Sequence, residues 1–303
     1  MQQDWLLSLG LPLALFTILL GMGLTLSVQD FLRVRQAPKA VALGLSGQFL
    51  LPPLAALLAI ALLQPEPIYA VGLLILSFAP SGATSNLMTF LARGDVALSV
   101  TLTAITSLIV PFTLPLLSAL ALHWGLGQTE AIHLPLLRTW AQLLLISLLP
   151  ILLGMSIAAY WPSFAKRLIP ALRPASLLFL LGVLIAITHN NWGQMPGFLR
   201  ATAPAVILMN VTAIGLGWAW ASVWRLPHAQ QTTLGLEVGV QNGGTALVIT
   251  LLVLNNAQLS IAPVIYGILM LFPGLAFGWL MAQYEPQSSS GSAHLSIKGE
   301  RHE

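Results

Sequence analysis

One acidic residue stands in the middle of a long apolar segment. Of the nine Asp and Glu residues in the sequence, Glu237 is the one that lies deep inside such a segment. A charge at the centre of a bilayer costs about 3 kcal/mol or more, so a residue of this kind normally faces the interior of a helix bundle and marks an ion or proton path. Glu237 is therefore the first candidate functional residue. The alternative is a structural polar contact between helices.

The segment around Glu237 is a poor helix. Residues 235–244 contain four glycines, together with the strongly polar side chains of Glu237, Gln241 and Asn242. Glycine costs about 1 kcal/mol relative to alanine in a helix interior. Unwound backbone at membrane depth is tolerated only where it is buried in protein or lines a wet cavity. The pattern predicts a broken helix whose freed carbonyl oxygens can bind a cation.

A second apolar segment breaks at residues 77–86. Pro80 removes a backbone donor and clashes with the preceding turn, and Ser81, Ser85 and Asn86 follow it closely. Such a kink by itself is as typical of helix packing as of a binding site. Ser99 and Thr103 lie four residues apart and share a helix face, although paired hydroxyls often bond their own helix. For the buried amide of Gln48, contact between helices and ion binding are both open.

The composition indicates that these segments lie in a membrane. The chain is 57% apolar and only 7% charged, with a mean hydropathy of +0.86, which is outside the range of soluble domains. The sequence has no cysteine, so disulfides, thiol catalysis and thiolate metal sites are all excluded. Nine apolar runs are long enough for transmembrane helices. They are Trp5–Leu26, Ala40–Leu63, Ile68–Ala92, Val96–Leu122, Leu134–Ala159, Pro174–Thr188, Ala201–Val223, Gln230–Leu254 and Ile261–Gln283.

The positions of the two breaks suggest an internal repeat. They fall in the third and eighth runs, which cross the membrane in opposite directions. Interrupted spans in corresponding positions are typical of transporters built from inverted repeats. We therefore predict an all-α integral membrane protein in which runs one to four correspond to runs six to nine. Residues 1–283 form a single transmembrane domain on this interpretation, with the first run retained as a span.

The basic residues predict the orientation of the chain. With the carboxyl terminus inside, ten of the twelve Lys and Arg residues lie on the cytoplasmic side, as the positive-inside rule requires. The amino terminus is then outside, and residues 284–303, which are polar and Ser-rich, are expected to form a disordered cytoplasmic tail. The cytoplasmic set is Arg33, Arg35, Lys39, Arg93, Lys166, Arg167, Arg173, Arg225, Lys298 and Arg301, with Arg138 and Arg200 outside.

Two long motifs resemble the bile acid:sodium symporter family. They are Ser81-Gly82-Ala83-Thr84-Ser85-Asn86 with its continuation to Ser99, and Glu237-Val238-Gly239-Val240-Gln241-Asn242. Gly21-Met22-Gly23-Leu24 and Gln48 also have counterparts in the family, and the resemblance covers nearly the whole chain. It implies a core domain in which two discontinuous helices cross, and a panel domain that moves against it. The layout is that of the nine-span members.

The resemblance also implies two sodium ions beside the crossing and an organic anion as substrate. This chain has Ala83 and the apolar stretch Leu271 to Gly274 at positions where relatives carry polar groups. The difference implies a less polar substrate cavity. The implied sites are Ser85, Asn86, Ser99, Thr103 and Glu237 for one sodium ion; Gln48, Glu237 and Gln241 with the backbone oxygens of Val238 and Val240 for the other; and Gly82, Ala83, Thr84 and Asn242 for the substrate.

The predicted function is sodium-coupled symport of a bile-acid-like, pantoate-like or 2-oxo acid anion by alternating access, in the inner (plasma) membrane. Proton coupling through Glu237 is the first alternative, and a receptor or scaffold that does not transport is the second. An enzyme is disfavoured, because the sequence has no His-x-x-x-His motif and no paired carboxylates within the membrane. The expected partners are the anion and the lipid bilayer. No nucleic acid or protein partner is implied.

Overall fold

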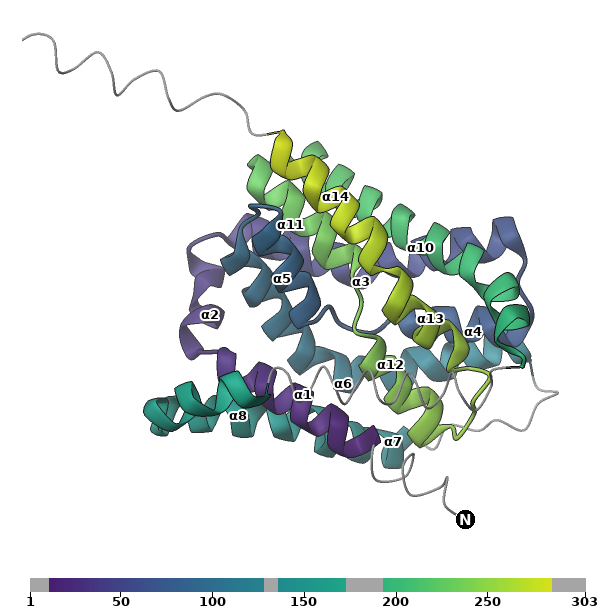
Figure 1. Ribbon diagram of the computed structural model, residues 1–303, viewed down its shortest axis with the longest axis horizontal. Coiled ribbons are helices and arrows are strands. Elements are labelled where there is room, and N and C mark those ends of the chain that lie inside the picture. Colours follow the sequence, from purple (N-terminus) through teal and green to yellow (C-terminus); the bar gives the residue numbers. More distant parts are fainter. Residues whose placement is uncertain (1–10, 128–135, 173–192, 285–303) are drawn as a thin grey trace, which may run out of the picture.

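The computed structural model describes residues 11–127, 136–172 and 193–284, and the regular elements among these residues are helices (Figure 1). Five helices are long and apolar enough to cross a bilayer, and shorter apolar helices accompany them. The protein is therefore a multi-span membrane protein. The five long helices are Pro38–Leu63, Val96–Leu126, Leu137–Tyr160, Met195–Val223 and Ile261–Gln283.

The first predicted break divides one span into two helices. α4 (Pro67–Ser77) ends just before Pro80, and α5 (Ala83–Leu91) begins three residues after it. Pro80 cannot donate a backbone hydrogen bond, so the helix ladder cannot continue through it. Gly82 precedes α5 in an extended conformation, and no side chain caps the amino terminus of that helix.

The second predicted break divides another span in the same way. α11 (His228–Gly239) contains Glu237 in its last turn, and α12 (Gly243–Leu247) continues into the π-helix η4 (Val248–Val253). Val240 is extended between them, with φ −107° and ψ 97°. The two breaks thus fall within the stretches that the sequence predicted.

The two breaks meet and cross. Ser81 and Gln241 form an antiparallel bridge, and the backbone nitrogen of Asn242 donates to the carbonyl oxygen of Pro80 at 2.8 Å. Each break therefore provides hydrogen-bond partners for backbone groups of the other. Inside a bilayer, unwound backbone needs such partners within the protein. In Figure 1 the connection between α11 and α12 runs near the centre of the view, where it crosses the connection between α4 and α5.

Continuous helices surround the crossing. α3 (Pro38–Leu63) and α10 (Met195–Val223) pack against each other and against α11, while α6 (Val96–Leu126) packs against α4, α5 and α11. Gly217 allows α10 to approach α11 closely, because a Cβ atom there would lie 2.6 Å from the carbonyl oxygen of Leu234. Two further helices also contact the broken helices: α13 (Ile261–Leu269) packs against α4 and α12, and α14 (Leu271–Gln283) packs against α5 and α11.

A second group of helices is built around α1 (Leu11–Thr25). Its main partner is α8 (Leu149–Tyr160). The two approach closely at Gly23 and Gly154, where an added Cβ would lie 2.3 Å from the carbonyl oxygen of Ile151 and 2.5 Å from that of Leu20. The other elements of this group are α7 (Leu136–Leu143), the π-helix η3 (Leu144–Leu148) and a helix over residues 162–172. The short elements α2 (Val28–Leu32) and η2 (Arg33–Arg35) pack against α6 instead.

Polar and apolar side chains are distributed as a bilayer demands. Large apolar side chains are exposed on the outside, among them Leu50, Phe112 and Trp279. Many hydroxyl and amide groups are buried, including Gln48, Thr103 and Asn210. A lipid-facing surface gains nothing from polar groups, so these groups gather where helices contact one another.

The predicted spans agree with the described helices within a few residues at most ends. The sixth span, Pro174–Thr188, lies outside the described residues, as do the first residues of span one and the tail from residue 285. The count of nine spans and the disordered tail therefore stay predictions.

Candidate cation and substrate site

Four hydroxyl groups surround the carboxylate of Glu237, which is 1% exposed. Ser81 and Thr103 reach Oε2 at 2.5 and 3.1 Å. Ser85 and Ser99 reach Oε1 at 2.7 and 2.5 Å. These residues come from the first break, from α5 and from α6, so the crossing of the two broken helices against α6 is what assembles the site.

Further oxygen atoms complete this cluster. The side-chain oxygen Oδ1 of Asn86 lies 2.6 Å from Ser99 Oγ and 3.2 Å from Thr103 Oγ1. Ser85 Oγ lies 2.7 Å from the carbonyl oxygen of Gly82, and Ser81 Oγ lies 3.1 Å from Thr103 Oγ1. The hydroxyls of Ser99 and Thr103 thus face Glu237 and Asn86.

The cluster has fewer protons than its contacts require. Each of the four hydroxyls lies within hydrogen-bond distance of two or more oxygen atoms, yet each can donate one proton. A carboxylate and an amide oxygen add acceptors only, and protonation of Glu237 would add a single proton. A hard cation contacts several oxygens at once without any proton, so this donor set fits such an ion.

The charge of the cluster points to an ion of low charge. Glu237 supplies one negative charge, and the other groups are neutral oxygens. Among the described residues, no three His, Cys, Asp or Glu side chains come together as a metal-binding group. Multivalent and transition metals favour several carboxylates, imidazoles or thiolates.

A second polar group lies on the other side of Glu237. The amides of Gln48 and Gln241 are 3.1 Å apart, and Gln241 Nε2 donates to the carbonyl oxygen of Val238 at 2.7 Å. With its amide oriented to suit its neighbours, Gln48 donates to the carbonyl oxygen of Glu237 at 2.6 Å and accepts from the backbone nitrogen of Ser81 at 3.2 Å. Gln48 therefore connects α3 to both breaks.

Two residues that the sequence analysis missed hold the end of α11. Asn210 Nδ2 donates to the carbonyl oxygen of Gly239 at 2.7 Å, and the hydroxyl of Tyr266 donates to the same oxygen. This carbonyl has lost its helical partner at the break, so the two donors replace the missing hydrogen bond. The contact of Ser81 with Glu237 was also missed. The position of Ser81, directly after the helix-breaking Pro80, could have indicated that it belongs to the site.

A cavity of about 450 Å³ adjoins the cluster. It lies between α1, α5, α6 and the helix over residues 162–172. The polar side chains among its lining residues are Thr25 and Asn86, and the hydroxyl of Thr25 donates to the carbonyl oxygen of Met22 in its own helix at 2.7 Å. The lining residues are Ile18, Gly21, Met22, Thr25, Ala83, Asn86, Leu87, Val96, Val100 and Ile169.

The predicted substrate residues are only partly brought to this cavity. Ala83 lines it, whereas Asn242 is not among its lining residues. Asn242 instead caps α12, its Oδ1 accepting from the backbone nitrogen of Thr245 at 3.3 Å. A Cβ atom on Gly82 would lie 3.5 Å from Asn242 Nδ2. Gly82 and Asn242 therefore pack together at the crossing, and Thr84 lies in the first turn of α5.

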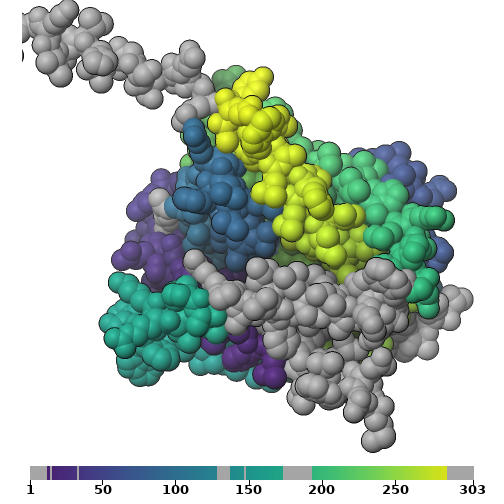
Figure 2. Space-filling model, in the orientation of Figure 1, coloured from purple at the N-terminus to yellow at the C-terminus, as the bar shows by residue number. Residues whose placement is uncertain are grey.

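The expectation that residues 271–274 make the substrate cavity less polar stays a prediction. Residues 271–274 do not border the cavity. Phe272 is 65% exposed, and a Cβ atom on Gly274 would meet the side chains of Met88 and Val240. Figure 2 shows α14 lying along α5 on the outer face. The apolar character of this stretch therefore reflects packing on α5 and contact with lipid.

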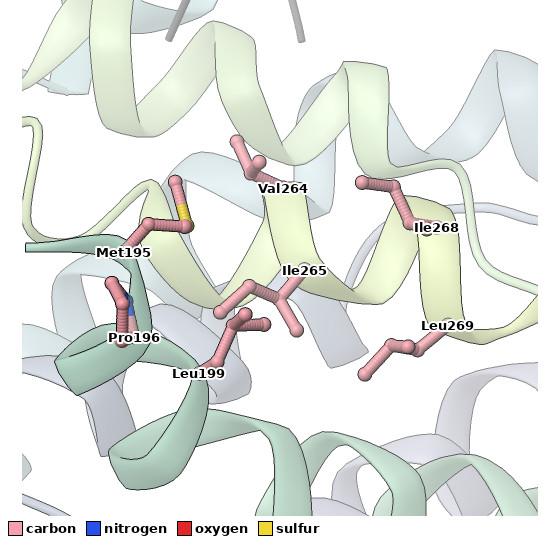
Figure 3. A pocket seen from close by; sticks show the side chains of 7 residues that line it. All are labelled: Met195, Pro196, Leu199, Val264, Ile265, Ile268 and Leu269. Carbon is pink, nitrogen blue, oxygen red and sulfur yellow. The ribbon is translucent and has the colours of Figure 1, made fainter. Parts of the chain in front are cut away.

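A second, wholly apolar pocket of about 430 Å³ lies between α10 and α13 (Figure 3). Among the residues that the structure describes, its lining has no hydrogen-bonding side chain and shares no residue with the cavity beside Asn86. The lining residues are Met195, Pro196, Leu199, Val264, Ile265, Ile268 and Leu269.

Comparison with known proteins gives a family match. Residues 12–196 match the model of the "Sodium Bile acid symporter family". The chain is 30% identical over 285 residues to "Uncharacterized sodium-dependent transporter YocS" of Bacillus subtilis, covering 92% of this chain and 86% of that protein.

Longer relatives also match. "Sodium/bile acid cotransporter 4" of Homo sapiens is 33% identical over 234 residues, which are 76% of this chain and 52% of that protein. "Probable sodium/metabolite cotransporter BASS1, chloroplastic" of Arabidopsis thaliana is 28% identical over 235 residues, covering 76% of this chain and 56% of that protein. The matched region thus spans about half the length of these two relatives.

Proposed function

This chain belongs to the sodium bile acid symporter family, a family of transporters and not of enzymes, and from this membership and the crossing we propose that it couples sodium ions to the transport of a small organic anion. The observation that carries the proposal is the proton-poor oxygen cluster around Glu237. It joins both broken helices and α6, so an ion bound there contacts three separate elements.

The first sodium ion is assigned to Ser85, Asn86, Ser99, Thr103 and Glu237, to which we add Ser81. The second is assigned to Gln48, Glu237 and Gln241 with the backbone oxygens of Val238 and Val240. Glu237 is shared and supplies the single negative charge, while amide and carbonyl oxygens replace the water shell of each ion. The contacts of Gln48 and Gln241 with the carbonyl oxygens of Glu237 and Val238 support the second assignment.

The organic anion is assigned to the cavity beside Asn86. Its volume of about 450 Å³ is within the usual range of about 300–1,000 Å³ for small-molecule sites. The amino terminus of α5 is uncapped by any side chain, and helix amino termini favour anions. Gly82, Ala83, Thr84 and Asn242 are the proposed positioning groups. The substrate is a bile-acid-like, pantoate-like or 2-oxo acid.

Transport requires the cavity to open alternately to each side. The cavity lies at the boundary between the group built around α1 and α8 and the helices around the crossing. We assign these two groups as the panel and the core, and movement between them as the step that changes access. Sodium drives this step only if it binds one arrangement better than the other.

The orientation is proposed from the positions of the basic residues. Lys39 Nζ donates to the carbonyl oxygen of Trp224 at 2.7 Å, and the backbone nitrogen of Asp95 donates to the carbonyl oxygen of Ala229 at 3.2 Å. The first turn of α3, which carries Lys39, therefore lies at the same end as the loops that carry Arg93 and Arg225. We assign that end to the cytoplasmic side of the plasma membrane.

The test is uptake by the purified protein in proteoliposomes, with labelled pyruvate, pantoate and taurocholate as probes. An inward sodium gradient should drive uptake of at least one probe, and replacing sodium with potassium should abolish it. Glu237→Gln keeps the shape of the side chain but removes its charge, so its sodium-dependent uptake should fall to background. Glu66→Gln, at an exposed carboxylate before α4, is the matched control and should behave like the wild type.

Proton coupling is the second candidate, because Glu237 is a single buried carboxylate. It predicts uptake driven by a proton gradient in sodium-free medium. Full sodium dependence of the Glu237→Gln variant would contradict the assignment of both ions. Sodium-dependent binding without uptake would instead favour a receptor or scaffold.

A further inference from the structure

We propose that the side-chain amide of Asn86 contacts both ligands, and that sodium decides which end of this amide faces the anion. The inference rests on the proposed function and adds a substrate-contacting residue to it. In this arrangement Oδ1 belongs to the ion cluster, and Nδ2 donates to a carboxylate in the cavity.

The position of Asn86 supports this double contact. Its Oδ1 faces Ser99 and Thr103 at 2.6 and 3.2 Å, and the residue also lines the cavity. A carboxamide is planar, with its oxygen and nitrogen on separate branches. When Oδ1 lies in the cluster, Nδ2 is therefore on the other branch of the amide, and we place it as the donor to an anion in the cavity that Asn86 lines.

The shortage of protons in the cluster makes this orientation depend on the ion. Ser99 and Thr103 have one proton each, and Glu237 is the stronger acceptor for both. Once those protons are given to Glu237, the hydroxyls present only lone pairs to Asn86. Without a cation the amide is then better satisfied with Nδ2 turned inward. With a cation among the oxygens, Oδ1 turns inward as a ligand.

The orientation of the amide matters because the cavity offers few other polar groups. The hydroxyl of Thr25 is engaged by the carbonyl oxygen of Met22 in its own helix, and the other lining side chains within the described part of the chain are apolar. With sodium bound, the cavity presents an N–H donor to an oxyanion. Without sodium, it presents a carbonyl oxygen that repels the oxyanion. Coupling between ion and substrate thus passes through one side chain.

Asn242 provides a contrast at the other break. Its Oδ1 accepts from the backbone nitrogen of Thr245, so its orientation is set by the cap of α12 and does not depend on an ion. Asn242 is therefore a fixed group of the crossing, and Asn86 is the group that responds to sodium.

The experiment measures sodium binding and its dependence on an anion separately. The thermal unfolding midpoint of the purified protein is titrated with sodium, at constant ionic strength with choline, in the absence and presence of pyruvate, pantoate or taurocholate. For the wild type, at least one probe should lower the sodium concentration for half-maximal stabilisation by about tenfold or more, the effect of a hydrogen bond to a charged group.

The decisive variant is Asn86→Asp, which keeps an oxygen for the ion but removes the donor. Sodium alone should still stabilise it, at an equal or lower concentration because a negative charge has been added, while the effect of the anion disappears. Asn86→Ser adds no charge, and its single, shorter hydroxyl cannot reach both ligands as the two branches of the amide do, so it should lose the anion effect while retaining a weaker sodium response. Asn256→Asp is the control, because Asn256 Oδ1 also accepts hydrogen bonds, from the backbone nitrogens of Gln258 and Leu259, and Asn256 is not among the residues that line the cavity.

Each outcome decides between the two proposals. If Asn86→Asp and Asn86→Ser keep the wild-type effect of the anion on sodium binding, the inference is wrong and the proposed function stands. If sodium stabilises the wild type but no probe changes its affinity, the inference is again wrong, and the ion assignment survives. If sodium does not stabilise the wild type at all, the proposed function itself fails.

Discussion

The carboxylate of Glu237 receives short contacts from four hydroxyl groups that belong to three separate parts of the chain. Such a cluster is expensive to build inside a membrane, because every oxygen must lose its access to water. The arrangement makes sense if the oxygens are satisfied by something other than their own protons. This is why the number of protons, and not the buried carboxylate alone, carries the assignment of a cation.

Ser81 offers a test of the cluster at the scale of one atom. Ser81→Ala removes an oxygen 2.5 Å from Glu237 Oε2. It should raise the sodium concentration for half-maximal thermal stabilisation about tenfold, as expected for the loss of one contact to a charged group.

Ser118→Ala is the matched control for this substitution. Ser118 is also fully buried, but its hydroxyl has no hydrogen-bond partner within the described structure. Its removal should leave the sodium response unchanged. Equal responses of the two variants would show that Ser81 does not contribute to the ion site.

The sequence pointed to members of the cluster where a residue's chemistry is unusual for its surroundings. Glu237 stood out as a charge in an apolar run, and Ser99 and Thr103 shared a helix face that the structure turns toward it. Ser81, Asn210 and Tyr266 were missed, because a hydroxyl or amide in a membrane helix is common. Which of these groups meet the crossing depends on how helices far apart in the sequence pack together.

At the scale of helices, the breaks depend on close packing around them. α10 approaches α11 at Gly217, directly beside the turn that carries Glu237. Gly217→Ala would place a Cβ atom 2.6 Å from the carbonyl oxygen of Leu234 and 2.8 Å from Val238 Cβ. Because both neighbours belong to α11, the substitution must push the two helices apart.

We therefore expect Gly217→Ala to destabilise the protein by about 1–3 kcal/mol, as overpacking commonly does. It should also weaken the sodium response. Gly215→Ala, on the same helix, is the control, because a Cβ atom there meets nothing within 4 Å. The measurement is the thermal unfolding midpoint with and without sodium. Equal midpoints for the two variants would contradict this account of the packing.

The surroundings of residues 271–274 are also decided at this scale. Both breaks could be located in the sequence because Pro and Gly interrupt a helix wherever they occur. The direction in which an apolar helix faces could not be predicted, since α14 is apolar on all sides and carries no amphipathic period. Contact with α5 decides which of its residues are buried.

At the scale of the whole molecule, the orientation can be tested directly, because the chain has no native cysteine. Single cysteines at two exposed positions, Glu66→Cys and Gln36→Cys, lie at opposite ends of α3. A membrane-impermeant maleimide applied to intact cells should label the first and spare the second until the membrane is permeabilised. The reverse pattern would invert the proposed topology.

The backbone contact between Pro80 and Asn242 has a consequence for how the protein is made. Ser81 and Glu237 are 156 residues apart, so at roughly 5–20 residues per second the ribosome needs about 8–30 s to produce the second after the first. During that time the first broken helix is in the bilayer with polar backbone groups that have no protein partner from the other break. Its packing is therefore incomplete, and we expect the nascent chain to be most open to quality-control proteases before the second broken helix has been made.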